Sequence, residues 1–136
     1  MATASATGRL LKRAQYRNHR AVDRALGEVG TTLAQWDALR AIHEAPDSSA
    51  HDLATRTFQS DQAFGTLANR LEAQGLIERA SGHGRRVEHR LTASGRAMYE
   101  AGVPVAAAIV EQSLARLSPA EITTLHDLLD RVGIAE

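Results

Sequence analysis

The sequence predicts a mostly α-helical domain that carries a small β wing of two or three strands. Apolar residues recur at helical spacing in six segments, and the fourth of these segments ends at Gly75. A short apolar strand follows, then a tip rich in glycine and arginine at 82–86, and then a return strand that ends at Leu91. A helix followed by a basic-tipped ribbon can place one element in a DNA major groove and the other in the neighbouring minor groove. Nucleic acid is therefore the first partner that the sequence predicts.

Composition limits the class of protein. The length of 136 residues, with 43% hydrophobic and 24% charged residues, is typical of a single globular domain, and we expect a cytoplasmic protein. The absence of cysteine excludes disulfides, thiol-based redox sensing and cysteine-ligated zinc. The net charge is zero, but the first thirty residues hold six basic and two acidic side chains, whereas the last forty are acidic. The field at a binding face depends on this local charge, so neutrality does not exclude a DNA partner.

The first three helices follow from periodicity and caps. We expect disorder in residues 1–6, a first helix over 8–29, a second over 34–44 and a third over 50–57, capped by Ser49. The buried side of the first helix is predicted to hold Leu11, Ala14, Val22, Ala25, Leu26 and Val29. The second helix is predicted to bury Trp36, Leu39 and Ile42.

The fourth helix begins after Ser60, a favourable N-cap, and has two different faces. Its predicted core stripe is Phe64, Leu67, Ala68 and Leu71. The opposite stripe is Gln62, Gly65, Thr66, Asn69 and Ala73, which is polar but nearly uncharged. A merely solvated face more often carries Glu and Lys, whereas amides and hydroxyls suit base edges. This stripe is therefore predicted to contact DNA, with plain solvent exposure as the alternative.

The last two helices follow the hairpin. Thr92 caps a long helix over 93–116, in which Pro104 is expected to introduce a kink or a break. The segment Ser118-Pro119-Ala120-Glu121 is a strong helix start, with apolar residues along one side of the helix that follows. The terminal helices carry more apolar surface than a small helix-plus-wing module needs. We interpret this surplus as the contact with a second copy, the alternative being that the helices cover each other.

The chain resembles the MarR family of winged helix-turn-helix regulators over about 8–132. The resemblance rests on three motifs in this order: LAQWDAL at 33–39, LEAQGLIER at 71–79 and LTASGR at 91–96. It implies a homodimer with dimerisation helices at about 8–30 and 93–136 and a DNA-binding lobe at about 33–92. It also implies repression of nearby genes, often relieved by a small aromatic acid or phenol. Two positions depart from the family pattern: His83 replaces the usual acidic residue at the wing tip, and Gly65-Thr66 lacks the usual arginine.

The candidate site residues follow from both lines of argument. Gln62, Thr66 and Asn69 are predicted to read base edges, with Gly65 on the same face. Ser60, Arg70 and Arg86 are predicted to hold phosphates, and the resemblance places Arg85 in the minor groove. The candidate ligand-binding residues, between the dimerisation helices and the lobe, are Tyr16, His19, Trp36, Arg40 and His43.

The sequence leaves few alternatives to DNA binding. No phosphate-binding loop, nucleophile elbow or Ser-His-Asp pattern occurs, so we expect no enzyme, no catalytic residue and no cofactor. Six histidines leave a metal-responsive regulator open as an alternative, although none forms a close ligand pair. A winged-helix module that binds proteins instead of DNA is the other alternative, and a regulator without a ligand is a third. The operator, the regulated genes and the sign of regulation cannot be predicted from the sequence.

Overall fold

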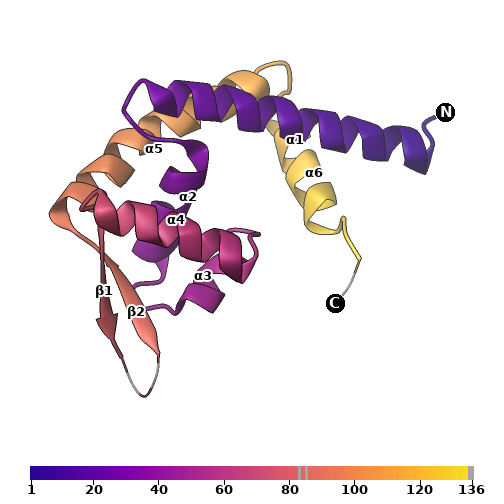
Figure 1. The fold of residues 1–136 in the computed structure, drawn as a ribbon. Coiled ribbons are helices and arrows are strands. Elements are labelled where there is room, and N and C mark those ends of the chain that lie inside the picture. The colour runs from indigo at the N-terminus through magenta and orange to yellow at the C-terminus, as the bar shows by residue number, and fades with distance from the viewer. Residues whose placement is uncertain (83, 85, 135–136) are drawn as a thin grey trace.

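A computed structural model describes residues 1–82, 84 and 86–134, and within them six helices and one two-stranded sheet (Figure 1). In chain order the elements are α1 (Ala4–Gly27), α2 (Leu33–Glu44), α3 (Ala50–Arg56), α4 (Asp61–Ala73), β1 (Ile77–Ser81), β2 (Val87–Leu91), α5 (Ala93–Ser113) and α6 (Pro119–Asp130). The predicted class, mostly helical with a small wing, is confirmed. No helix in the described part of the chain has the length and apolar character needed to cross a membrane.

Hydroxyl side chains cap the start of every described helix. Ser49, Ser60, Thr92 and Ser118 each accept a backbone hydrogen bond at the predicted position. Such a cap satisfies an N–H group that has no partner inside the helix. The start of α1 was predicted wrongly. The helix begins at Ala4 instead of residue 8, because Thr3 accepts a hydrogen bond from the backbone N–H of Ala6 at 3.1 Å, so residues 4–6 are helical.

The core has two clusters. The larger one lies between α2, α3, α4 and the wing, and contains Leu39, Ile42, Leu53, Phe64 and Leu71 among its fully buried side chains. The smaller one joins α1, α2 and α5 and contains Val22, Leu26, Trp36 and Ala106. The predicted core stripe of α4 is confirmed, except that Leu67 is half-buried.

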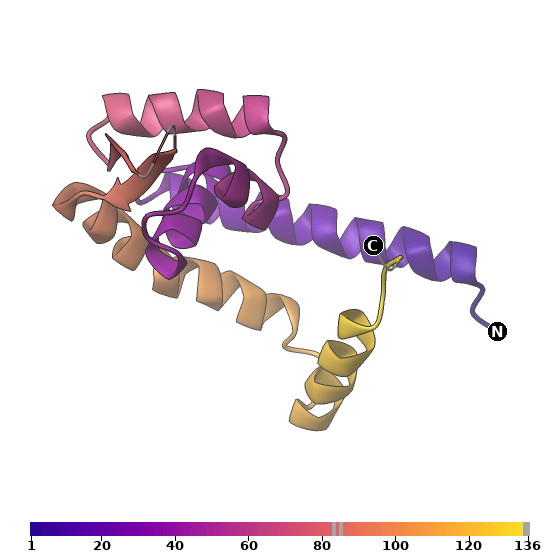
Figure 2. The ribbon, with the colours of Figure 1, turned by 90° about the horizontal axis from the view of Figure 1, so that it is seen from below.

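Two residues predicted to be buried in α1 are exposed instead. Leu11 is 42% exposed and Ala14 also lies on the surface. The reason is visible in the arrangement of the helices. The C-terminal half of α1 packs beside α5, whereas its N-terminal half projects away from the lobe, as does α6 (Figures 1 and 2). None of the residues of α6, all of which the structure describes, is buried.

The wing is an antiparallel hairpin in which Ile77 lies opposite Leu91 and Ser81 opposite Val87. A single isolated bridge between Ser48 and His89 replaces the third strand that the sequence left open. His89 is buried against the edge of Phe64, with ring centroids 6.0 Å apart, and its Nδ1 lies 3.0 Å from the backbone carbonyl oxygen of Ser48. Because that carbonyl can only accept, Nδ1 carries a proton.

Burial lowers the pKa of His89 below its ordinary value. Below about pH 6.5 the unfolded chain therefore binds a proton that the folded chain does not, so the free energy of unfolding falls as the pH falls. We expect urea unfolding between pH 7 and pH 5 to show this loss in the wild type and a smaller loss in His89→Gln. Equal slopes in the two proteins would contradict a lowered pKa for the buried His89.

Helix α5 is a single helix that contains Pro104 without a break. Two glycines allow it to approach its neighbours closely. A Cβ atom at Gly95 would lie 1.9 Å from the carbonyl oxygen of Leu76, and one at Gly102 would lie 2.2 Å from Nε1 of Trp36. Glycine at these positions therefore allows α5 to pack against both α2 and the segment that leaves α4.

Candidate nucleic-acid interface and ligand cavity

Helix α4 presents its polar stripe outward. Gln62, Thr66 and Asn69 are exposed and Gly65 is half-buried. The Thr66 hydroxyl donates to the carbonyl oxygen of Gln62 at 3.2 Å, and so it can only accept a further hydrogen bond from outside. Ser60 accepts a hydrogen bond from the backbone N–H of Ala63 at 3.1 Å, so its side chain caps the helix. The residues predicted to read bases thus share one open face, with Ser60 at its start.

A cluster that the sequence did not predict joins α4 to the wing. The Arg79 guanidinium donates to both carboxylate oxygens of Glu72, at 2.8 and 3.2 Å, and to Oδ1 of Asn69 at 2.8 Å. This arginine holds the pKa of Glu72 below its ordinary value. The contact crosses the turn at Gly75, so helical periodicity cannot reveal it. The sequence signal is an acidic residue in the last turn of a helix and an arginine at the start of the next strand.

Two arginines of the wing are tied to α3 and to the loop before it. Arg86 lies 3.4 Å from an Asp52 carboxylate oxygen and 3.5 Å from the carbonyl oxygen of Asp47, and Arg90 pairs with the Asp47 carboxylate. Arg86 is therefore already directed toward α3, although 48% of its side chain is exposed. The wing-tip residues His83 and Arg85 lie outside the described residues.

The N-termini of α3 and α4 meet through a histidine and a carboxylate. His51 Nδ1 lies 3.0 Å from Oδ1 of Asp61, which stands in the first turn of α4. The hydrogen bond with Asp61 raises the pKa of His51. A protonated His51 offsets the negative charge of Asp61 at the end of the helix expected to approach phosphates.

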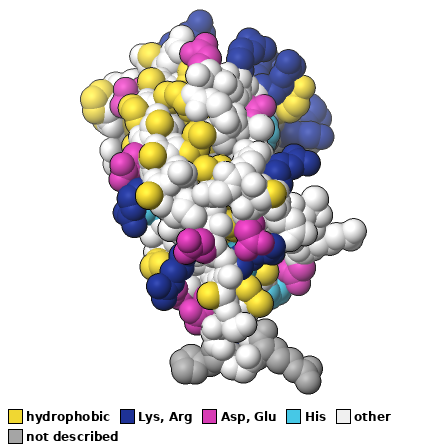
Figure 3. Space-filling model, turned by 60° about the vertical axis from the view of Figure 1, so that its left-hand side comes forward, with side chains coloured by type: hydrophobic (Ala, Val, Ile, Leu, Met, Phe, Trp, Pro, Cys, Tyr) yellow, Lys and Arg dark blue, Asp and Glu magenta, His cyan; other side chains and the backbone are white. Residues whose placement is uncertain are grey.

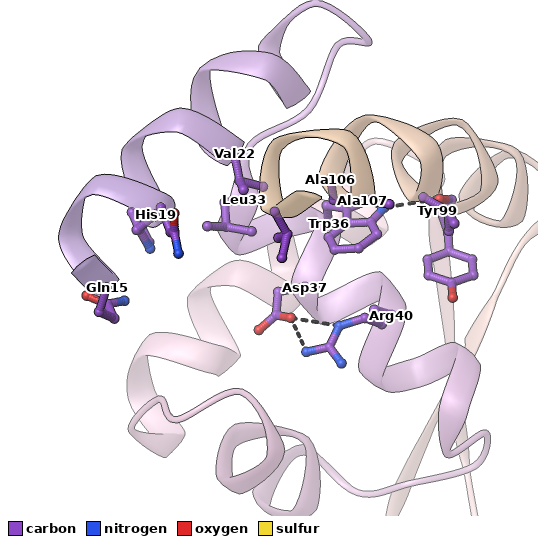
Figure 4. A pocket seen from close by; sticks show the side chains of 13 residues that line it. Gln15, His19, Val22, Leu33, Trp36, Asp37, Arg40, Tyr99, Ala106 and Ala107 are labelled. Carbon is purple, nitrogen blue, oxygen red and sulfur yellow. Dashed lines mark hydrogen bonds and ion pairs between the residues drawn. The ribbon is translucent and has the colours of Figure 1, made fainter. Parts of the chain in front are cut away.

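A cavity of about 680 Å³ lies between α1, α2 and α5 (Figure 4). The described residues that line it are Gln15, Asn18, His19, Val22, Leu33, Trp36, Asp37, Arg40, Tyr99, Val103, Ala106, Ala107 and Val110. Trp36 forms part of the wall, and its Nε1 donates to the carbonyl oxygen of Tyr99 at 3.0 Å. The rings of these two residues stack with centroids 5.8 Å apart. The aromatic and aliphatic lining suits a small planar molecule.

The structure separates the five candidate ligand-binding residues. His19, Trp36 and Arg40 line this cavity, whereas Tyr16 and His43 do not. Tyr16 is 57% exposed, with the Arg20 guanidinium over its ring, and His43 stacks on Tyr99. Arg40 is paired with Asp37 and Glu44, and the hydrogen bond with Asp37 raises its pKa. Among the described residues, no three His, Asp or Glu side chains converge in a way that could hold a metal ion.

Helices α3 and α4 packed as a pair, followed directly by a hairpin, define a winged helix-turn-helix protein. The chain belongs to the MarR family. The MarR family model matches residues 29–86. The HTH-type transcriptional repressor Rv2887 of Mycobacterium tuberculosis is 31% identical over 114 residues, which cover 82% of each chain.

Solved structures of related proteins also show this similarity to the MarR family. A probable transcriptional regulator from Pseudomonas aeruginosa is 34% identical, with a TM-score of 0.82, over 91% of this chain and 94% of that one. The salicylic acid complex of the M. tuberculosis MarR family protein Rv2887 is 29% identical, with a TM-score of 0.76, over 98% of both chains. The DNA complex of the same protein has a TM-score of 0.78 at 28% identity, over 98% of this chain and 100% of that one. The named relatives are thus regulators of transcription.

Proposed function

We propose that this protein is a dimeric, sequence-specific DNA-binding repressor whose affinity for its operator falls when a small aromatic molecule occupies the cavity. The main support for this proposal is the exposed stripe of Gln62, Thr66 and Asn69 on α4, with the arginine-bearing wing beside it. Amide and hydroxyl groups on a helix of this kind match the hydrogen-bonding groups of the major groove. The related Rv2887 binds DNA with the same fold, which supports this reading.

Phosphate contacts complete the proposed interface. Arg70 is exposed at the edge of the stripe, and Ser60 stands at the start of α4. The wing supplies Arg86, and the resemblance adds Arg85 to the same group. Contacts of this type hold the protein in register on the duplex but carry no sequence information themselves.

Salt dependence tests the DNA-binding proposal. We expect the wild type to bind a random-sequence duplex at low salt in fluorescence anisotropy, with log affinity falling linearly with log salt. Arg70→Ala is expected to reduce that slope by about one unit, because one phosphate contact is lost. Arg116, exposed between α5 and α6, gives the matched control, since Arg116→Ala is expected to leave the slope unchanged. Absence of binding at low salt would favour the protein-interaction module instead.

A second copy of the chain is the proposed partner of α6 and the N-terminal half of α1. Both carry exposed apolar side chains that the described part of the chain leaves uncovered: Leu10 and Leu11 on α1, Ile122, Leu128 and Leu129 on α6, and Val132 just after α6. Exposed apolar surface of this kind is typical of an interface. The proposed dimerisation helices are thus α1, α5 and α6, and residues 33–92 form the DNA-binding lobe.

Charge complementarity supports the same pairing. Helix α1 carries six basic residues and one acidic residue. In Figure 3, Lys and Arg side chains gather near the top of the molecule, the level at which α1 runs in Figure 1. Helix α6 carries three acidic residues, Glu121, Asp127 and Asp130, and neither lysine nor arginine. Opposite charges on the two uncovered helices favour contact between α1 of one copy and α6 of the other.

The cavity is the proposed effector site. Its aromatic wall suits a ligand such as salicylic acid, which the related Rv2887 binds. Arg40 is the one Lys or Arg among the described residues that line it, and Asp37 already holds its guanidinium. A carboxylate ligand therefore has to compete with Asp37 for this group. The cavity joins α1 and α5 to α2, so a ligand there can alter the position of the lobe relative to the dimerisation helices.

Trp36, the single tryptophan of the chain, reports on this site directly. We expect salicylic acid to quench Trp36 fluorescence with saturation and to weaken duplex binding over the same concentration range. Ala107 lines the cavity and Ala108 does not, although both are exposed. Ala107→Phe is expected to fill the space and abolish the quenching, whereas Ala108→Phe is expected to retain it. Equal quenching in the two variants would place the ligand elsewhere.

A further inference from the structure

The contact between Arg79 and Asn69 determines how an exposed amide of α4 faces outward. Arg79 lies at the beginning of the wing, and 25% of its side chain is exposed. Glu72 binds it through both carboxylate oxygens, which fixes the plane of the guanidinium. The remaining donor of Nη2 reaches Oδ1 of Asn69 at 2.8 Å. Asn69 is thus held by a group that is itself held on two sides.

The chemistry of the two groups fixes the orientation of the amide. A guanidinium has N–H donors and no acceptor, so only the oxygen of the Asn69 amide can face it. The amide nitrogen, with two donors, is left on the other side, and it has no hydrogen-bond partner among the described residues. Asn69 is exposed and shares the face of Gln62 and Thr66. It therefore presents donors, and no free carbonyl, in that direction.

We propose that Arg79 is a positioning residue that makes Asn69 a hydrogen-bond donor toward DNA, so that Asn69 selects guanine over adenine. This inference rests on the proposed DNA-binding function. In the major groove guanine offers two adjacent acceptors, O6 and N7, to either of which the amide nitrogen can donate. Adenine offers an acceptor at N7 and a donor at N6, and an asparagine binds both only when its oxygen and nitrogen are both free. Arg79 holds the amide oxygen toward the wing, so that oxygen is not free to turn toward the N6 donor of adenine.

Selection of bound duplexes from a randomised pool, followed by sequencing, tests the inference. The wild type is expected to enrich guanine over adenine about tenfold at one position in each half-site. In Arg79→Met the amide is free to rotate, and we expect the preferred base at that position to change to adenine while the other positions stay the same. Arg79→Lys keeps a group that only donates, and it is expected to retain the wild-type preference for guanine at that position. Arg90→Met removes an arginine from the other wing strand, where it pairs with Asp47, and is expected to leave guanine unchanged.

A second variant keeps the inference testable if Arg79→Met folds poorly. In Asn69→Asp, Arg79 still holds one oxygen, but the group that faces DNA becomes an acceptor, and the preference is expected to change from guanine to cytosine. An unchanged base preference in both Arg79→Met and Asn69→Asp would overturn the inference. So would a loss of affinity that is equal for all bases. Failure of the wild type to enrich any sequence would instead remove the proposed function, so the two results are distinguishable.

Discussion

Removal of α6, by ending the chain after Leu117, is expected to give a monomer that binds the operator about 10²–10⁴-fold more weakly than the wild type. The reason is that two recognition helices on one dimer bind adjacent half-sites as a linked pair, so the second contact becomes intramolecular. Helix α6 has no buried residue although the structure describes all of it, so its loss removes little of the core. Analytical ultracentrifugation gives the oligomeric state, and anisotropy with the selected operator gives the affinity.

Point variants distinguish the loss of the dimer from a general loss of stability. Leu129 lies on the apolar side of α6 and is 44% exposed in the single chain, so Leu129→Glu is expected to disrupt the dimer. Thr123 lies on the other side of the helix, and Thr123→Glu is expected to leave the dimer intact. A monomeric wild type, or a dimeric chain without α6, would show that α6 does not form the interface.

Gly95→Ala is expected to destabilise the fold by about 3 kcal/mol, the upper range for overpacking at a closely packed position. A Cβ atom there would lie 1.9 Å from the carbonyl oxygen of Leu76. The obstacle is backbone, and the same carbonyl also accepts the N–H of Thr92 at 3.1 Å, so neither side can move without breaking a hydrogen bond. Urea unfolding monitored by circular dichroism measures the change in free energy of unfolding.

Gly8 is the matched control for that substitution. It also lies within a helix, α1, and a Cβ atom there would meet nothing within 4 Å among the described residues. Gly8→Ala is expected to stabilise the protein by up to about 1 kcal/mol through helix propensity alone. If Gly95→Ala behaved like Gly8→Ala, the close packing of α5 against the end of α4 would be wrong.

Local signals in the sequence were sufficient to predict the helices of residues 33–92, the proposed DNA-binding lobe. Ser60 marked the start of α4, Gly75 marked its end, and helical spacing separated Phe64 and Leu71 from the polar stripe. These features depend on neighbouring residues of one element. The same applies to the capping box of Ser118 and Glu121, in which both predicted hydrogen bonds are present.

Contacts between side chains of different helices and strands could not be predicted from the sequence. Leu11 has the spacing of a buried residue, but within one chain nothing described covers it, since the uncovered half of α1 is the proposed dimer surface. Tyr16 and His19 are three residues apart, yet only His19 reaches the cavity. The orientation of Asn69 depends on Arg79, ten residues away across a turn. Periodicity describes which face a residue occupies, and does not describe which side chain from another element meets it there.

Selection of duplexes from a randomised pool by the wild-type protein tests the central claim most directly. We expect an enriched inverted repeat whose half-sites lie about one helical turn, ~34 Å, apart, because two α4 helices of a two-fold dimer enter consecutive major grooves. The affinity for this sequence should exceed that for random duplex by about 10³-fold or more at physiological salt. Recovery of no enriched sequence, with binding that disappears at moderate salt, would contradict sequence-specific recognition by this protein.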